Sequence, residues 1–109
     1  MPWYLMIRQN NSKPEETTVE RHLHWLRNQH ERGVVLISGP DPDLTRSIYV
    51  VCAPSSAAAE EVARADPLDH DGQAPLDIIE WHVHQLLGIG PFEIGEFPAA
   101  PANSGDSER

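Results

Sequence analysis

The order of apolar runs along this 109-residue chain constrains its fold more than any other feature. The runs cover residues 3–8, 34–37, 48–51 and 76–83, and they are rich in the branched and aromatic side chains that β-strands favour. Residues 3–8 are apolar at nearly every position, as in a strand buried on both faces. A helical pattern lies between the first two runs, and another between the last two.

The first helical pattern has two possible starts. A capping box fits residues 17–20, and another fits residues 12–15 around Pro14, so the start stays open between them. Gly33 predicts the end of this helix. Its apolar stripe is predicted to contain Val19, Leu23 and Leu26.

The second helical pattern is rich in alanine. Ser55 or Ser56 can cap its start, and Pro67 must end it, since proline disfavours the helical conformation of the residue before it. In the last run, alternation places Ile79, Trp81 and Val83 on one face of a strand.

The resulting order is strand, helix, strand, strand, helix, strand. It predicts an α+β, ferredoxin-like βαββαβ fold with a four-stranded antiparallel sheet. Right-handed crossovers place both helices on one face of the sheet, which leaves an apolar face uncovered. We expect a second copy to cover it, so that a homodimer forms a dimeric α+β barrel.

Charge and composition narrow the class of partner. The chain has 8 Lys and Arg against 17 Asp and Glu, a net charge of -9, which disfavours nucleic acid and anionic lipid. No apolar run approaches the length of a membrane span, and the first residues lack the pattern of a secretory signal, so we expect a cytoplasmic protein. The single Cys52 is expected to be a buried, inert thiol.

Composition also divides the chain. Residues 1–97 are predicted to form one domain, with a C-terminal extension at 88–97 in which Phe92, Ile94 and Phe97 alternate and can pack on the partner copy. Residues 98–109, rich in Pro, Ala, Ser and Asn, are predicted to be a disordered tail.

Histidines are numerous in this short chain. His82 and His84 point the same way from one strand, with Glu80 beside them, but two imidazoles without an evident third ligand favour a polar row over a metal site. We therefore predict no metal and no cofactor. On the first helix, His24 is expected in solvent, and packing and capping explain His30.

His22 differs because it lies at the edge of the predicted apolar stripe. A half-buried imidazole there suits a general acid or base, although a plain boundary histidine fits the position as well. Asp66 follows the second helix, where a carboxylate meets the negative end of the helix dipole. Turn chemistry before Pro67 explains Asp66, and so does a role in orienting a histidine; spacing alone does not decide.

Several of these residues together resemble the YCII-like family. The resemblance rests on the joint spacing of His22-Leu-His-Trp-Leu, the turn Ser38-Gly39-Pro40, the segment Ala65-Asp66-Pro67-Leu68, and Glu80-Trp81, and it spans residues 2 to 86. Members share the dimeric α+β barrel. The polar, acidic stretch after Pro67 departs from the family pattern and makes His70 a possible extra pocket residue.

The resemblance implies a histidine and aspartate centre at His22 and Asp66. The chain also has a distant resemblance to muconolactone isomerases. We expect a cofactor-independent lyase or isomerase acting on a small cyclic or aromatic-derived compound, with substrate contacts from Ser38, Gly39, Pro40 and His70. One alternative is a non-catalytic dimeric module that binds a small ligand or protein. A further alternative is a cofactor-free monooxygenase-like barrel.

Overall fold

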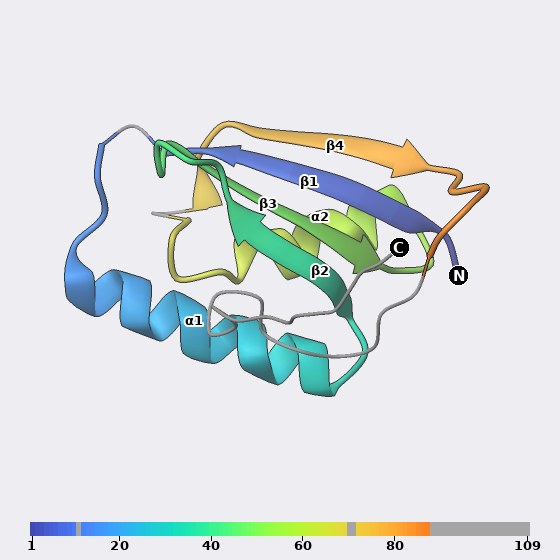
Figure 1. Cartoon of the computed structure of the whole chain (residues 1–109), viewed down its shortest axis with the longest axis horizontal. Helices are drawn as coiled ribbons and strands as arrows, with labels where there is room; N and C mark the ends of the chain where they lie inside the picture. The colour runs from blue at the N-terminus through green and yellow to red at the C-terminus, as the bar shows by residue number, and fades with distance from the viewer. Residues whose placement is uncertain (11, 70–71, 88–109) are drawn as a thin grey trace, which may run out of the picture.

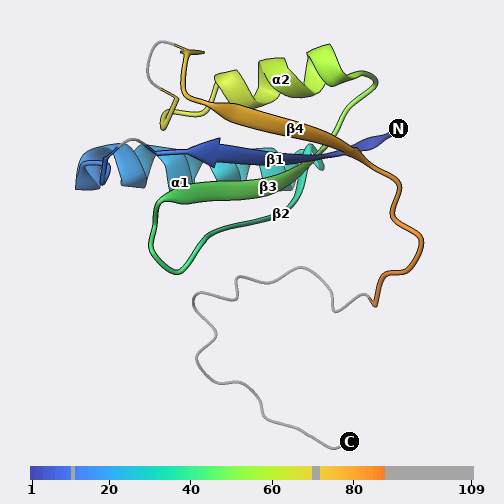
Figure 2. The same ribbon diagram turned by 90° about the horizontal axis from the view of Figure 1, so that it is seen from above.

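The computed structural model describes residues 1–10, 12–69 and 72–87. Within them six elements follow in order: β1 (Trp3–Gln9), α1 (Glu16–Glu31), β2 (Val35–Pro40), β3 (Arg46–Cys52), α2 (Ser56–Arg64) and β4 (Leu76–Trp81). The strands form one antiparallel sheet in the order β2-β3-β1-β4, which Figures 1 and 2 show side by side. The predicted α+β, ferredoxin-like arrangement is confirmed.

Both helices pack on the same face of the sheet, as the crossover rule predicts. Leu26 of α1 joins Ala59 and Ala63 of α2 in one buried cluster with side chains from the central strands. Those strand residues alternate along the chain, as expected for one face of a sheet. They are Tyr4, Met6, Tyr49 and Val51.

The ends of the helices follow local rules in part. Gly33 adopts a positive φ of 74°, and its N–H and that of Val34 donate to the carbonyls of His30 and Gln29, which closes α1 as predicted. Ser55 caps α2 by accepting a hydrogen bond from the N–H of Ala58 at 3.1 Å. Neither predicted capping box starts α1, which begins after Glu15 without a side-chain cap.

The buried face of α1 differs from the predicted stripe. The buried residues are Thr18, His22, Leu26 and Gln29, whereas Leu23 is 54% exposed and His24 and His30 are exposed. The helix is therefore turned so that His22 lies within the buried face and not at its edge. The prediction was wrong here because it ranked positions by apolarity, while buried polar partners set the orientation.

The face of the sheet opposite the helices remains open in the single chain. Trp3, Leu5 and Ile7 of β1 are half-buried, where burial on both faces was predicted. On the other strands the same face is unevenly exposed: Ile37 is 62%, Ile79 48% and Trp81 45% exposed, whereas Val50, which pairs with Leu5, is buried. The strand β4 also ends at Trp81, earlier than predicted, so His82 and Val83 lie outside the sheet.

Three predictions fall outside the described residues. The extension at 88–97 and the tail at 98–109 lie there, as does His70. Among the residues that the structure describes, no helix has the length and apolarity to cross a bilayer.

Candidate functional site

The structure brings His22 and Asp66 into direct contact. Nδ1 of His22 lies 2.7 Å from Oδ1 of Asp66, across 44 residues of sequence. His22 projects from the second turn of α1, and Asp66 follows the last turn of α2, so the two helices supply one partner each. Asp66 is 1% exposed and His22 is 8% exposed. The contact between them is therefore buried.

Asp66 is surrounded by hydrogen-bond donors. Its Oδ2 accepts from Nη1 of Arg8 at 2.9 Å and from the hydroxyl of Tyr49 at 3.1 Å, and its Oδ1 accepts from the N–H of Leu68 at 2.9 Å. These three groups are donors, so both oxygens of Asp66 act as acceptors in this network. Asp66 therefore accepts from His22 as well, and the proton of a neutral His22 ring belongs on Nδ1.

Arg8 and Tyr49 are members of this site that the sequence reasoning missed. Arg8 ends the apolar run of β1 and is fully buried, with Nη1 2.8 Å from the hydroxyl of Tyr49. Burial disfavours the charge of Arg8, but Tyr49 and Asp66 outweigh burial and raise the pKa of its guanidinium. The alternation of side chains along β1 could have indicated its burial, because Arg8 lies on the same helix-covered face as Tyr4 and Met6.

Tyr49 keeps its proton within this network. Burial raises the pKa of Tyr49, and the neighbouring Asp66 carboxylate raises it further. Its ring also lies 5.9 Å from that of Trp25, which in turn stacks on His22 at 6.5 Å between centroids. Tyr49 therefore holds both the carboxylate and, through Trp25, the plane of the imidazole.

A small apolar cleft lies on the other side of His22. Its volume is about 130 Å³. His22 lines it and Asp66 does not, and the described residues supply no hydrogen-bond partner for Nε2 of His22. The lining residues come from α1, from β3 and the loop before it, and from the segments around them. They are Asn10, Pro14, Val19, His22, Leu23, Leu26, Gly39, Pro40, Leu44, Arg46, Ser47, Ile48, Tyr49 and Leu68.

The predicted substrate contacts divide between two places. Gly39 and Pro40 line the cleft beside His22. Ser38 does not line it: its hydroxyl lies 2.9 Å from Nε2 of His30, on the neighbouring part of the helix-covered face. His70 falls outside the described residues.

Comparison with known proteins shows the family of this chain. A model of the YCII-related domain matches residues 1–82. The chain belongs to the YCII-related domain family. It is also 33% identical over 78 residues to YjpA of Bacillus subtilis (strain 168), itself described as uncharacterized, over 72% of this chain and 92% of YjpA.

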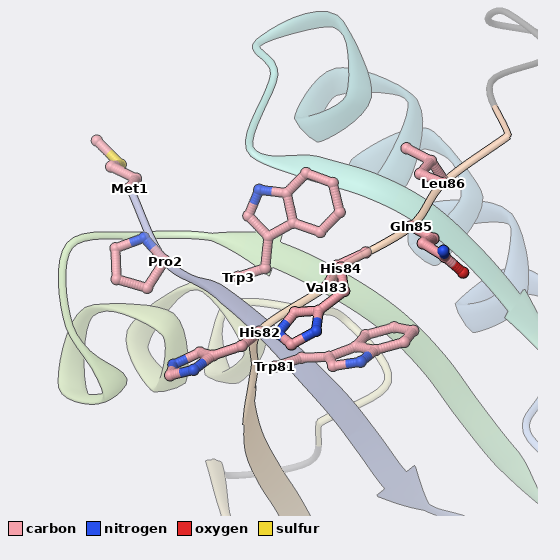
Figure 3. Close-up of a pocket in the computed structure, with 9 residues that line it drawn as sticks. All are labelled: Met1, Pro2, Trp3, Trp81, His82, Val83, His84, Gln85 and Leu86. Atoms are coloured by element: carbon pink, nitrogen blue, oxygen red, sulfur yellow. The ribbon is translucent and has the colours of Figure 1, made fainter.

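The YCII-related match ends at the edge of a second, wider cleft. This cleft has a volume of about 380 Å³ and lies where β1 begins and β4 ends, with the rings of Trp3, Trp81, His82 and His84 gathered around it (Figure 3). His82 pairs with Glu80, with Nε2 3.0 Å from Oε2. Among the described residues, no three His, Cys, Asp or Glu side chains form a group that suits a metal ion.

Proposed function

We propose that this YCII-related protein is a cofactor-independent lyase or isomerase in which His22 transfers a proton on a small cyclic or aromatic-derived compound. One observation carries the proposal: the His22 ring lies between a buried carboxylate and an apolar cleft. That placement gives the imidazole an oriented proton on Nδ1 and a free nitrogen toward any bound molecule, as proton transfer requires.

The size of the cleft supports a small substrate. An apolar cavity of about 150 Å³ accepts benzene, so a volume of about 130 Å³ suits a single ring or a fragment of similar size. Leu23, Leu44 and Leu68 supply apolar walls, while the backbone of Gly39 and the side chains of Asn10 and Ser47 offer polar contacts. Such a mixture binds an apolar body and orients one oxygen.

Each residue has a distinct role in this proposal. His22 is the catalytic residue, because it lines the cleft and only its Nδ1 is bonded to Asp66. Asp66 is a positioning residue, since it touches that nitrogen of the ring and not the cleft. This division of labour resembles histidine and aspartate pairs in other proton-transfer sites.

The open face of the sheet supports a dimer in solution. Ile37, Ile79 and Trp81 expose large apolar surfaces on that face, and a second copy stacked sheet to sheet would bury them. The small-molecule cleft lies on the helix-covered side, so each copy would carry its own site.

A non-catalytic ligand-binding module is the competing function. It is favoured by the other bonds of Asp66, which holds Arg8, Tyr49 and the N–H of Leu68 whether or not His22 moves a proton. Under this alternative the cleft binds a small molecule, and the pair of His22 and Asp66 only fixes the packing of the two helices.

Deuterium exchange distinguishes the two functions. Small cyclic ketones, lactones and phenol-derived compounds are incubated with the protein in D₂O, and loss of C–H signals is followed by proton NMR. We expect wild-type protein to accelerate exchange of at least one compound. His22→Gln should lose about 100-fold or more of that rate, while His24→Gln, an exposed change on the same helix, should keep it. The proposal would be overturned if compounds bind the cleft and none of them exchanges, or if exchange persists in His22→Gln.

A further inference from the structure

The cleft beside His22 contains a second polar group for which the described residues supply no partner. Ser47 lines this cleft together with His22 and is only 6% exposed. In the register of β1 and β3 it lies opposite Arg8, a fully buried residue of the helix-covered face, so the side chain of Ser47 points to that face of the sheet. The hydroxyl of Ser47 is therefore on the same side of the sheet as His22.

No group among the described residues hydrogen-bonds to the Ser47 hydroxyl. Its neighbour Arg8 directs its Nη atoms to other groups, among them Tyr49 and Asp66, and Tyr49 directs its own hydroxyl to Asp66. Oγ of Ser47 is nevertheless not sealed inside the protein, unlike Nε of Arg8, because it remains accessible from the cleft. Since buried hydroxyl groups nearly always have a hydrogen-bond partner, the partner of this one is whatever occupies the cleft.

The other polar side chains of the cleft are engaged elsewhere or less firmly held. Arg46 pairs with Asp41 at 3.3 Å, and alternation along β3 turns its side chain toward the open face of the sheet. Asn10 is half-buried and follows the last residue of β1. Ser47 instead lies within β3, where strands on both sides hold its backbone, so it is the best-fixed hydroxyl donor of the cleft.

We infer that Ser47 is a substrate-binding residue whose hydroxyl donates a hydrogen bond to a carbonyl oxygen of the molecule on which His22 acts. This inference rests on the proposed function and names its substrate class, a ring-sized carbonyl compound such as a cyclic ketone or lactone. The volume of about 130 Å³ admits a ring of that size. Apolar walls with a few fixed polar groups are typical of sites that bind such molecules in one orientation.

A carbonyl group also suits the proton transfer itself. When a C–H bond beside the carbonyl breaks, the proton bonds to a ring nitrogen of His22, and the electron pair enters the carbonyl to give an enolate with its negative charge on oxygen. A hydroxyl donor at that oxygen stabilises the charge as it develops. The proton then returns to another carbon in an isomerisation, or to a leaving group in an elimination. Because His22 and Ser47 are not hydrogen-bonded to each other, they can bind different atoms of one molecule.

The test compares the binding of two probes that differ in one acceptor atom. Cyclohexanone carries the carbonyl oxygen, whereas methylenecyclohexane has a CH₂ group in its place and nearly the same shape. Each probe is titrated into the full-length protein, and the backbone amide signals of the cleft residues are followed by two-dimensional NMR. The quantity compared is the change in each dissociation constant between wild-type protein and a variant, so the different hydration of the two probes cancels.

Ser47→Ala removes the hydroxyl with the least change in shape. It should weaken the binding of cyclohexanone by about 3- to 10-fold, as for the loss of one net hydrogen bond, and should not weaken the binding of methylenecyclohexane. Ser56→Ala, the same change at an exposed position of α2, should alter neither. The inference is wrong if cyclohexanone does not bind in the cleft of the wild-type protein, or if Ser47→Ala affects the two probes alike. If Ser47→Ala does not fold, Ser47→Cys carries the same comparison, because a thiol is a weak donor, and an equal effect on both probes is again contradictory.

This experiment fails separately from the proposed function, because the probes report binding and deuterium exchange reports proton transfer. If cyclohexanone binds through Ser47 and no compound exchanges, the binding role of Ser47 stands and the proton transfer by His22 does not. If carbonyl compounds exchange at the same rate in Ser47→Ala and bind it as tightly as wild-type protein, His22 acts without Ser47 and the inference is wrong.

Discussion

Replacing Asp66 with asparagine should destabilise the protein more than replacing His22 with glutamine. Asp66→Asn keeps the size of the side chain but removes its charge, and it leaves the fully buried Arg8 with only Asp69 at 3.4 Å as a charged partner. Breaking a buried ion pair by removing one partner costs about 3 to 5 kcal/mol. His22→Gln instead leaves Asp66 with Arg8, Tyr49 and the N–H of Leu68.

The expected cost of His22→Gln follows from what is lost. One hydrogen bond to a carboxylate and the stacking on Trp25 disappear, for a loss of about 1.5 to 3 kcal/mol at most. In a domain of this size 1 kcal/mol changes the melting temperature by about 4 to 8 °C. Asp66→Asn should therefore lower the melting temperature by roughly 12 °C or more, and His22→Gln by clearly less.

Urea denaturation followed by tryptophan fluorescence measures both variants, with thermal melts as a second reading. Asp43→Asn, an exposed carboxylate in the turn between β2 and β3, is the matched control and should change the free energy of unfolding by about 0.5 kcal/mol or less. If Asp66→Asn costs about 1 kcal/mol or less, or if His22→Gln costs as much as Asp66→Asn, then Asp66 is not the charge partner of Arg8 and the argument fails.

Three further predictions concern other parts of the molecule. Light scattering at low micromolar concentration should give about twice the 12.2 kDa chain mass, and Ile79→Glu on the open face should give a monomer; a monomeric wild type would contradict the stacked sheets. Hydrogen bonds from the side chain of Thr45 and from the backbone of Thr45 and Arg46 lower the pKa of Asp41, so Asp41→Asn should destabilise the fold at neutral pH. That difference should close as pH falls below about 4, because the native carboxylate then takes up a proton, and a constant gap in denaturation midpoints would argue against it. Gly33→Ala should cost about 1 kcal/mol in urea melts because residue 33 has a φ of 74°, and a neutral result would mean that the turn rearranges.

The elements of the fold follow from local patterns. The four strands arise where branched and aromatic residues cluster, and Gly33 and Ser55 set a helix end and a helix start that local rules predict. The topology then follows from element order and crossover handedness. These features depend on residues close in sequence, so the sequence was sufficient for them.

The site was only half predictable, because its partners are distant in sequence. Asp66 was conspicuous as a carboxylate at a helix end, and the family pattern indicated His22. For Arg8 the local pattern indicated only the face of β1 that it shares with Tyr4 and Met6, and it gave no partner, because the bond to Asp66 spans 58 residues. Polar residues that find buried partners escape any analysis that equates burial with apolarity.

The orientation of α1 shows what the site costs the fold. The helix buries an imidazole and leaves Leu23 54% exposed, although full burial of a leucine stabilises a protein by about 1.5 to 3 kcal/mol. Asp66 lies at the negative end of α2, and Nε of Arg8 has no partner among the described residues. These three departures from the rules of stable packing surround His22, which binds Asp66 on one side and lines the cleft together with Leu23. Local conflicts of this kind concentrate where a protein binds or reacts. A ligand in the cleft would cover Leu23 and hydrogen-bond to His22. Binding would therefore add part of the stabilisation that the fold lacks without a ligand.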